Sequence, residues 1–249
     1  MRIPQVIAHR GYQRRFPENT MSAIRAAVAG GAMFVEIDVQ LTADHVPVLL
    51  HDVTLDRMCG IDRPIHEVDS RELSQFRAAE SGRLGTQFSN EPVATLKQCC
   101  EFLMTQPDVQ LFVELKDSAA RLESDQFVVE SVLNDLQPVL GQCVCISFTR
   151  SLLQEVVRLS DCRIGPVIEE WSQRDVIAQF NDPPHVLFCE INGLPESGPL
   201  LLEGTDLAVY EVPDAATALE LGKRGVNYVE TFAACELLTE LNASAKNSA

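Results

Sequence analysis

Two histidines and two carboxylates stand on or just after short apolar segments near the start of the chain. They are His9, Glu36, Asp38 and His51. A run of four or five apolar residues suits a strand that is covered on both faces, and a polar residue at its end then emerges where sites are built. Histidine exchanges protons near neutral pH, and carboxylates bind hard divalent cations. These residue types therefore predict a site for metal-assisted acid–base chemistry.

The bulk composition limits the kinds of partner that such a site can serve. The chain has 249 residues, 46% of them hydrophobic, which is enough for one sizeable core. It carries 20 basic and 36 acidic residues, a formal net charge of −16. A field of this sign repels polyanions, so nucleic acid and anionic membranes are not expected partners. Any phosphate that the protein binds must be met by local positive charge.

Targeting and cysteine patterns indicate a soluble intracellular protein. The first strand begins within a few residues of Met1, which leaves no room for a secretory signal, and no apolar run reaches membrane-spanning length. The eight cysteines include no Cys-x-x-Cys pair, so we expect most of them to be small buried hydrophobes. The expected location is cytoplasmic, without stable membrane insertion. The sequence leaves the oligomeric state open.

Two apolar runs, 34–39 and 46–50, are separated by too few residues for a parallel crossover. They must therefore form an antiparallel hairpin. If the turn centres between positions 44 and 45, opposed residues have numbers that sum to about 89, which pairs Asp38 with His51. Side chains repeat with period two along a strand, so Glu36, Asp38 and His51 are expected on one face.

The rest of the chain alternates between helical and strand patterns. Without the return strand of the hairpin, eight parallel strands are expected near residues 6, 35, 112, 145, 165, 188, 209 and 229. Helices are expected near 21–28, 95–104, 124–136, 151–159, 176–180, 214–222 and 236–241. Eight such units predict an α/β fold, a closed TIM (β/α)8 barrel that forms a single domain over residues 1–249. The polar segment 53–92 is expected to be a small insertion, and 242–249 a frayed tail.

The catalytic face of such a barrel lies at the carboxyl ends of its strands. Besides the four residues above, these ends carry Arg10, Glu114, Lys116, Ser147, Glu190 and Glu230. Three carboxylates from adjacent strands suit Mg²⁺ or Ca²⁺, and a metal beside Arg10 and Lys116 makes a site for an anion. Two histidines supply an acid and a base. This combination predicts metal-assisted cleavage of a phosphate ester.

Several motifs resemble the glycerophosphodiester phosphodiesterase family in their order and spacing. They are His9-Arg10-Gly11, Pro17-Glu18-Asn19-Thr20, Glu36-x-Asp38, His51-Asp52 with Leu55-Asp56-Arg57, and Glu114-Leu115-Lys116. Ser147-Phe148 and Gly225-Val226-Asn227 also fit, so the resemblance extends over nearly the whole chain.

The resemblance implies a TIM barrel with an insertion after the strand that carries His51. It also implies hydrolysis of small glycerophosphodiesters, such as glycerophosphocholine or glycerophosphoethanolamine, to sn-glycerol 3-phosphate and an alcohol. The positions that match the family's metal ligands, for Mg²⁺ or Ca²⁺, are Glu36, Asp38 and Glu114. The matches to its catalytic pair are His9 and His51, and those to its phosphate-contacting residues are Arg10 and Lys116.

Near its end the sequence departs from the family pattern. Where the family commonly has an aromatic residue followed by Thr-Val-Asn, this chain has Tyr210-Glu211-Val212-Pro213. Where Thr-Asp closes the last strand of the family, it has Thr231-Phe232. An added glutamate and a lost acid change the charge and the hydrogen-bonding partners at the mouth, so the glycerol or alcohol pocket is expected to differ.

Other interpretations remain at this stage. Glu190 and Glu230 match no motif and are equally compatible with lining the pocket and with structural pairing. The protein could be a non-catalytic phosphate-binding barrel, or a barrel lyase or isomerase that uses the same carboxylates and metal. It could also be a related phosphodiesterase or a lysophospholipase D that acts on another alcohol or lipid group.

Overall fold

The strands form one closed barrel. The computed structural model describes residues 3–120 and 122–247. Within them nine strands form a sheet in the order β1-β9-β8-β7-β6-β5-β4-β2-β3, and β1 also pairs with β2. The strand bounds are β1 Gln5–Ala8, β2 Phe34–Leu41, β3 Pro47–Leu49, β4 Gln110–Leu115, β5 Cys143–Ser147, β6 Arg163–Ile168, β7 Val186–Glu190, β8 Asp206–Tyr210 and β9 Tyr228–Thr231. Only β3 pairs antiparallel among these strands, so the predicted eight-stranded parallel barrel is confirmed.

Helices connect the barrel strands. The longer ones are α1 Met21–Ala29, α5 Leu96–Leu103, α7 Asp125–Leu136, α8 Arg150–Leu159, α9 Ala215–Arg224 and α10 Ala234–Asn247. The short ones are α2 Asp56–Cys59, α3 Ser70–Leu73, α4 Ser81–Leu84 and α6 Asp117–Ala120, with 3-10 turns η1 Ile65–Glu67, η2 Gln137–Gln142, η3 Trp171–Gln179 and η4 Ile191–Gly193. Side-chain caps set several starts: Thr20 accepts a hydrogen bond from Ala23 N–H, and Thr95 and Gln98 form a capping box at α5.

Two helical segments differ from the sequence-based expectation. The segment after β6 is a 3-10 helix, η3, with no buried residue, and it begins before the helix that we expected near 176–180. Helix α10 extends to Asn247, whereas we expected it to end at Leu241. The first six positions of the predicted frayed tail are therefore helical, and positions 248 and 249 lie outside the described residues.

The interior of the barrel changes from apolar to polar along several of its strands. A buried cluster at its centre contains Ile7, Phe112, Val144, Ile146, Val167, Val186, Phe188 and Ala208. Two residues beyond Ile7 and Phe112, on the same faces of their strands, are His9 and Glu114. The same step of two leads from Phe188 to Glu190. Strand periodicity thus stacks the polar side chains directly above an apolar floor.

The hairpin register differs by one residue from the prediction. Val39 pairs with Leu49 and Gln40 with Val48, and Leu50 N–H donates to Asp38 O at 3.1 Å. Asp38 therefore faces Leu50 rather than His51, because the turn is one residue tighter than expected. The chain leaves the ladder after β3, and Gln40 Nε2 donates to the carbonyls of Leu50, His51 and Asp52. This side chain, rather than strand pairing, holds the segment that carries His51.

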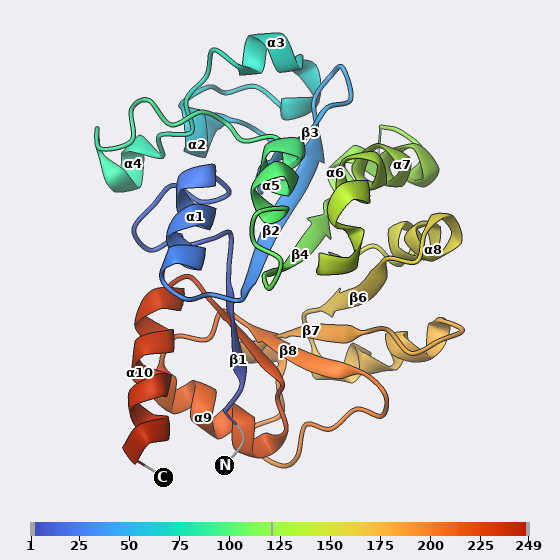
Figure 1. The fold of residues 1–249 in the computed structure, drawn as a ribbon. Helices are drawn as coiled ribbons and strands as arrows, with labels where there is room; N and C mark the ends of the chain where they lie inside the picture. The colour runs from blue at the N-terminus through green and yellow to red at the C-terminus, as the bar shows by residue number, and fades with distance from the viewer. Residues whose placement is uncertain (1–2, 121, 248–249) are drawn as a thin grey trace.

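The predicted insertion is a cap at one end of the molecule. Figure 1 shows α2, α3 and α4 gathered there, at the top of the view. A separate apolar cluster holds α2 and α3 on the hairpin: Val48, Leu50, Leu55, Met58, Ile65, Val68, Leu73 and Ala78. Because Val48 and Leu50 belong to this cluster, the cap and the segment leading to His51 pack as one unit.

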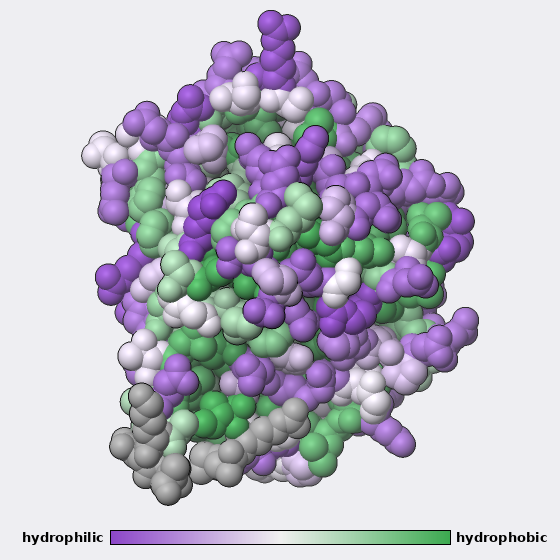
Figure 2. All heavy atoms as spheres, in the orientation of Figure 1, coloured by the Kyte–Doolittle hydropathy of each residue, from purple (hydrophilic) through white to green (hydrophobic). Residues whose placement is uncertain are grey.

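The surface over this cap is mostly hydrophilic. Figure 2 shows polar side chains over the region of α3, with hydrophobic patches further down the same face. None of the helices in the described part of the chain combines the length and the apolar character needed to cross a bilayer.

The apolar floor should carry much of the stability of the barrel. Phe112 is fully buried and has ring contacts with Phe34, Phe188 and Tyr228. Phe112→Ala should lower the free energy of unfolding by about 3–5 kcal/mol, because it leaves a cavity among rings that cannot collapse. Urea unfolding followed by circular dichroism measures this change.

Phe148→Ala is the matched control, because Phe148 is 51% exposed. It should cost about 1 kcal/mol or less. Equal losses in the two variants would contradict the proposed role of the floor.

Candidate active site

The loop after β1 has an unusual backbone that aims Arg10 at the barrel mouth. Arg10 has φ +55° and Gly11 φ +78°. A Cβ on Gly11 would lie 2.7 Å from the carbonyl carbon of Ala23, so only glycine lets this loop rest on α1. The Arg10 N–H donates to Glu36 Oε2 at 3.1 Å. The positive φ of Arg10 is strained for a non-glycine residue. The hydrogen bond to Glu36 and the ion pairs of the Arg10 side chain offset this cost.

Both carboxylate oxygens of Asp38 form ion pairs. Its partner in the β2–β4 register is Glu114. Lys116 Nζ lies 2.7 Å from Asp38 Oδ1 and 2.6 Å from Glu114 Oε1, and Arg10 Nε lies 3.0 Å from Asp38 Oδ2. Asn19 Nδ2 donates to the same Oδ2 at 2.7 Å and Asn19 Oδ1 accepts from Asp38 N–H, so the carboxylate is fixed.

His9 lies in a buried niche between two glutamates. Its Nε2 is 3.8 Å from Glu36 Oε2 and its Nδ1 is 3.8 Å from Glu230 Oε2. The ring of Phe232 stacks on the imidazole with centroids 4.5 Å apart and planes at 11°. Phe232, which departs from the family pattern just after β9, therefore contacts His9 directly, and Glu230 of β9 lies beside its Nδ1.

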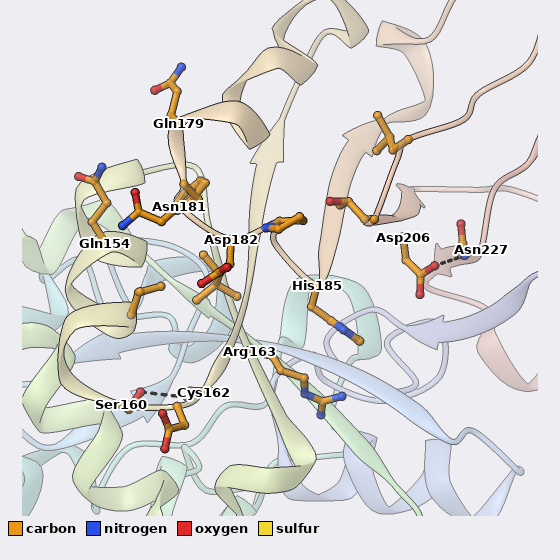
Figure 3. A pocket seen from close by; sticks show the side chains of 18 of the residues that line it. Gln154, Ser160, Cys162, Arg163, Gln179, Asn181, Asp182, His185, Asp206 and Asn227 are labelled. Atoms are coloured by element: carbon orange, nitrogen blue, oxygen red, sulfur yellow. Dashed lines mark hydrogen bonds between the residues drawn. The ribbon is translucent and has the colours of Figure 1, made fainter.

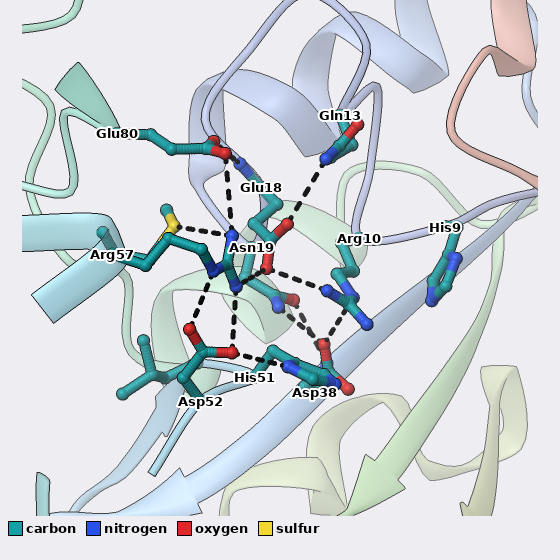
Figure 4. Close-up of polar contacts among 12 residues, drawn as sticks. His9, Arg10, Gln13, Glu18, Asn19, Asp38, His51, Asp52, Arg57 and Glu80 are labelled. Atoms are coloured by element: carbon teal, nitrogen blue, oxygen red, sulfur yellow. Dashed lines mark hydrogen bonds and ion pairs between the residues drawn. The ribbon is translucent and has the colours of Figure 1, made fainter. Parts of the chain in front are cut away.

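His51 belongs to a second chain of contacts that runs into the cap (Figure 4). His51 Nδ1 lies 2.7 Å from Asp52 Oδ1, and Arg57 Nε donates to Asp52 Oδ2 at 2.7 Å. Arg57 Nη2 also donates to Glu18 Oε1 at 2.6 Å, and Arg10 Nη1 donates to the same oxygen at 3.0 Å. One buried carboxylate thus links the loop that carries His9 and Arg10 to the cap that positions His51.

Burial and nearby charges raise the pKa values of three carboxyl groups of the site and lower that of the fourth, Asp38. Burial raises the pKa of Glu36 well above its usual range, and the neighbouring carboxylates Asp38 and Glu230 raise it further. Burial, with Glu114 nearby, likewise raises the pKa of Glu230, and burial with Asp38 raises that of Glu114. For Asp38 burial acts in the same direction, but Lys116 and Arg10 outweigh it and lower the pKa. At neutral pH Asp38 is therefore ionised.

The two histidines have different surroundings. Burial lowers the pKa of His9 well below its usual range, and the positive charge of Arg10 lowers it further; His51 also lies close enough to contribute. His9 is therefore neutral near pH 7. His51 has a more exposed side chain, and its partner Asp52 has a pKa of about 2, because Arg57 and His51 outweigh the effect of burial.

The donor set of the site suits a divalent cation. One oxygen each from Glu36, Asp38 and Glu114 lies within 4.8 Å of the others. Glu36 Oε1 is buried and has no hydrogen-bond partner in the described residues, as expected of a metal ligand. All-oxygen donors suit Mg²⁺ or Ca²⁺. The Lys116 ammonium contacts two of the three carboxylates, so it must shift when all three bind one ion.

All seven predicted site residues converge on the barrel mouth, but the sequence missed several of their partners. Glu18 and Asn19 were seen only as part of a motif, and their roles depend on contacts with residues far along the chain. Ser147 is not free for chemistry, because its hydroxyl donates to Leu115 O and accepts from Thr149 N–H. Glu190 Oε1 accepts from Asn192 at 2.9 Å, which is a structural pairing. Glu230 lines the site.

A separate pocket lies away from this chemistry, at the amino-terminal ends of β6, β7 and β8 (Figure 3). Its volume is about 1230 Å³. Two of its lining residues are engaged in structural contacts: Arg163 donates to Gln110 and Gly141, and Asp206 accepts from Asn227. In a barrel the catalytic face is the opposite one, so pocket size does not identify the active site here.

Comparison with known proteins agrees with the geometry of the site. The model of the Glycerophosphoryl diester phosphodiesterase family matches residues 9–183, a range that begins at His9 and includes all seven predicted site residues. The chain belongs to this family. The match ends before Glu230 and Phe232, two neighbours of His9.

Individual family members support the same assignment. Glycerophosphodiester phosphodiesterase 1 of Mus musculus is 35% identical over 151 residues, 61% of this chain and 43% of that protein. Glycerophosphodiester phosphodiesterase of Caldanaerobacter subterraneus is 35% identical over 111 residues, 45% of this chain and 44% of that protein. The matched segments thus span less than half of these relatives.

A solved structure shows the same fold over almost the whole chain. A phosphodiesterase from Oleispira antarctica, in complex with the product sn-glycerol-3-phosphate, superposes with a TM-score of 0.82 at 24% identity. The superposition covers 96% of this chain and 97% of that one.

The raised pKa of Glu36 predicts how pH and metal affect stability. In metal-free protein the folded state holds this pKa above the usual value of 4.5, so ionisation of Glu36 opposes folding as pH rises above 4.5. Glu36→Gln removes that penalty. In chelator its melting temperature should exceed that of the wild type, by a margin that grows from about pH 5 to about pH 8. Differential scanning calorimetry measures the margin.

Added Mg²⁺ or Ca²⁺ should reverse this order, because an ion that binds only the folded wild type raises its melting temperature. Glu101→Gln, at an exposed position of α5, is the control and should follow the wild type in both conditions. A Glu36→Gln variant that gains as much from the metal as the wild type would refute the ligand role of Glu36.

Proposed function

We propose that the protein hydrolyses glycerophosphodiesters to sn-glycerol 3-phosphate and an alcohol, using two histidines and a divalent cation. The observation that carries the proposal is the convergence of His9 and His51 on a mouth that also holds Arg10, Lys116 and three carboxylates. A phosphate-binding barrel without catalysis would need the positive charge but not two imidazoles at the same mouth.

Arg10 and Lys116 are suited to bind the phosphate group. Both are mostly buried, and nearby carboxylates raise their pKa values against the opposing effect of burial, so both stay charged at any working pH. Their charges supply the local attraction that a protein of net charge −16 needs for an anionic substrate. A divalent cation held by Glu36, Asp38 and Glu114 supplies Lewis-acid polarisation of the phosphoryl oxygens.

We assign the base of the first step to His9, because its lowered pKa keeps the ring neutral near pH 7. His9 takes the proton of the attacking oxygen, which is either the glycerol 2-hydroxyl or a water molecule. As the bond from phosphorus to the alcohol breaks, His51 gives its proton to the departing oxygen. In the cyclic route, His51 then takes a proton from water while His9 returns one to the glycerol oxygen, so the enzyme ends as it began.

Asp52 and Arg57 are proposed to orient His51. The contact between Asp52 Oδ1 and His51 Nδ1 engages one ring nitrogen and leaves Nε2 for the substrate. Arg57 donates to both oxygens of Asp52, which fixes the carboxylate in turn. Because Arg57 lies on α2, the cap contributes to the site by setting the orientation of a catalytic ring.

Activity should depend on substrate and metal together. Purified protein with Mg²⁺ or Ca²⁺ should release glycerol 3-phosphate from glycerophosphocholine or glycerophosphoethanolamine, measured with a coupled dehydrogenase. Exhaustive chelation should abolish the activity, and one divalent metal should restore it, because the buried carboxylates then regain their counter-charge. No product from any glycerophosphodiester would refute the hydrolase, and full activity in chelator would refute the metal role alone.

The two histidines should each be needed for turnover. His9→Ala and His51→Ala should lower kcat by about 10²- to 10⁴-fold, the usual contribution of general acid–base catalysis. His66→Ala, in the cap, is the control and should be close to the wild type.

A substrate with a more acidic leaving alcohol, such as the p-nitrophenyl ester of glycerol 3-phosphate, separates the roles. It should restore the rate of His51→Ala much more than that of His9→Ala, because a good leaving group no longer needs the proton from His51. The opposite pattern would exchange the two assignments.

A further inference from the structure

Several buried ligand atoms on one side of the site are left without partners. Asp38 and Glu114 are neutralised by Lys116, and Asp38 also by Arg10. On the other side, His9 Nδ1, Glu36 Oε1 and Glu230 Oε1 are buried and make no hydrogen bond within the described residues. His9 is 6% exposed, Glu36 1% and Glu230 3%. Unpaired polar atoms this deeply buried are costly unless a ligand satisfies them.

The spacing of these atoms matches the coordination shell of one ion. One ligand atom from each of His9, Glu36 and Glu230 lies within 4.8 Å of the others. The two distances of 3.8 Å start from different nitrogens of the His9 ring, Nε2 to Glu36 and Nδ1 to Glu230, and both are too long for hydrogen bonds. Ligands bonded to one zinc ion at about 2.1 Å lie about 3.4 Å apart in a tetrahedral shell, so the ion would bind one ring nitrogen and the glutamate side chains would move closer to it.

We propose that His9, Glu36 and Glu230 form a second cation site, specific for a divalent transition-metal ion. It differs from the site of Glu36, Asp38 and Glu114 in its chemistry, because an imidazole nitrogen replaces one oxygen donor. Imidazole with two carboxylates suits Zn²⁺ and related ions, whereas Mg²⁺ and Ca²⁺ prefer oxygen alone. Glu36 is shared, so the two sites lie side by side across one carboxylate.

The surroundings of His9 favour an ion there. The stacked ring of Phe232 covers one face of the imidazole and holds its plane in place. Glu230 is on β9 and His9 follows β1, two neighbouring strands whose register pairs Ala8 with Thr231, so backbone pairing fixes the separation of the two ligands. A site on rigid, hydrogen-bonded strands needs little reorganisation to bind.

An ion at this site would affect catalysis through His9, a consequence that rests on the proposed function. A ring nitrogen bonded to a metal ion cannot take or return a proton. Zn²⁺ at the second site should therefore inhibit the hydrolysis that Mg²⁺ or Ca²⁺ supports, by lowering kcat.

Binding is tested without activity, by titrating Zn²⁺ into metal-free protein in a calorimeter at pH 7. The wild type should bind one Zn²⁺ per chain with an affinity that Glu230→Gln lowers by about 100-fold or more, since even outer-shell changes cost 10- to 100-fold. Glu114→Gln is the matched variant, a buried glutamate on the other side of Glu36. It should keep the wild-type affinity for Zn²⁺.

Co²⁺ provides a second readout that is independent of the variants. Its visible spectrum in the wild type should show nitrogen and oxygen ligands and no thiolate charge-transfer band, which excludes the buried thiols of Cys145 and Cys162, 3.7 Å apart. Circular dichroism checks that both glutamine variants are folded. Unchanged Zn²⁺ affinity in Glu230→Gln, a larger loss in Glu114→Gln, or a thiolate band would each overturn the second site.

The two proposals fail in different experiments. If Zn²⁺ binds through Glu230 but no glycerophosphodiester is cleaved, the second site stands and the hydrolase is refuted. If cleavage is observed but Zn²⁺ binding is absent, the hydrolase stands and the second site is refuted.

Discussion

The structure depends on how four buried carboxylates are accommodated at the mouth of one barrel. Glu36, Asp38, Glu114 and Glu230 are all at least nine-tenths buried, and they raise one another's pKa values wherever no cation intervenes. Removing charge from water is costly unless it is paired. Arg10 and Lys116 compensate Asp38 and, in part, Glu114, which leaves Glu36 and Glu230 with an unmet need for positive charge. The cost of burying these four carboxylates together fits the cation-binding role proposed for them.

A single oxygen of Glu18 connects the two halves of the site. It accepts hydrogen bonds from Arg10, on the loop after β1, and from Arg57, in the cap. Burial opposes the ionisation of Glu18, but the hydrogen bond from Arg57 and the charge of Arg10 outweigh it and lower the pKa. The insertion is thus coupled to the loop that carries Arg10 by charge-assisted hydrogen bonds, which are short and directional. A cap that moved away would leave this carboxylate buried and half-paired.

The surroundings of His9 in this chain include two residues that lie outside the segment matched by the family model. Its family supplies the loop, the paired carboxylates and the second histidine, all within residues 9–183. Phe232 and Glu230 lie beyond that range, yet one stacks on the His9 ring and the other faces its Nδ1. A buried glutamate beside an imidazole changes both its electrostatic environment and the ligands available to an ion.

The sequence alone determined the strands, their number and the set of candidate site residues that meet at the barrel mouth. Apolar runs and the short hairpin connection were sufficient, because a barrel strand is defined by its own burial pattern and period. The tertiary structure decided the rest. The hairpin register was wrong by one residue, since one position in the turn decides it, and His51 reaches the site through Gln40 instead. The contacts of Glu18, Glu230 and Phe232 span distant segments of the chain. Such contacts leave no local pattern, because side-chain geometry exists only once the barrel has closed.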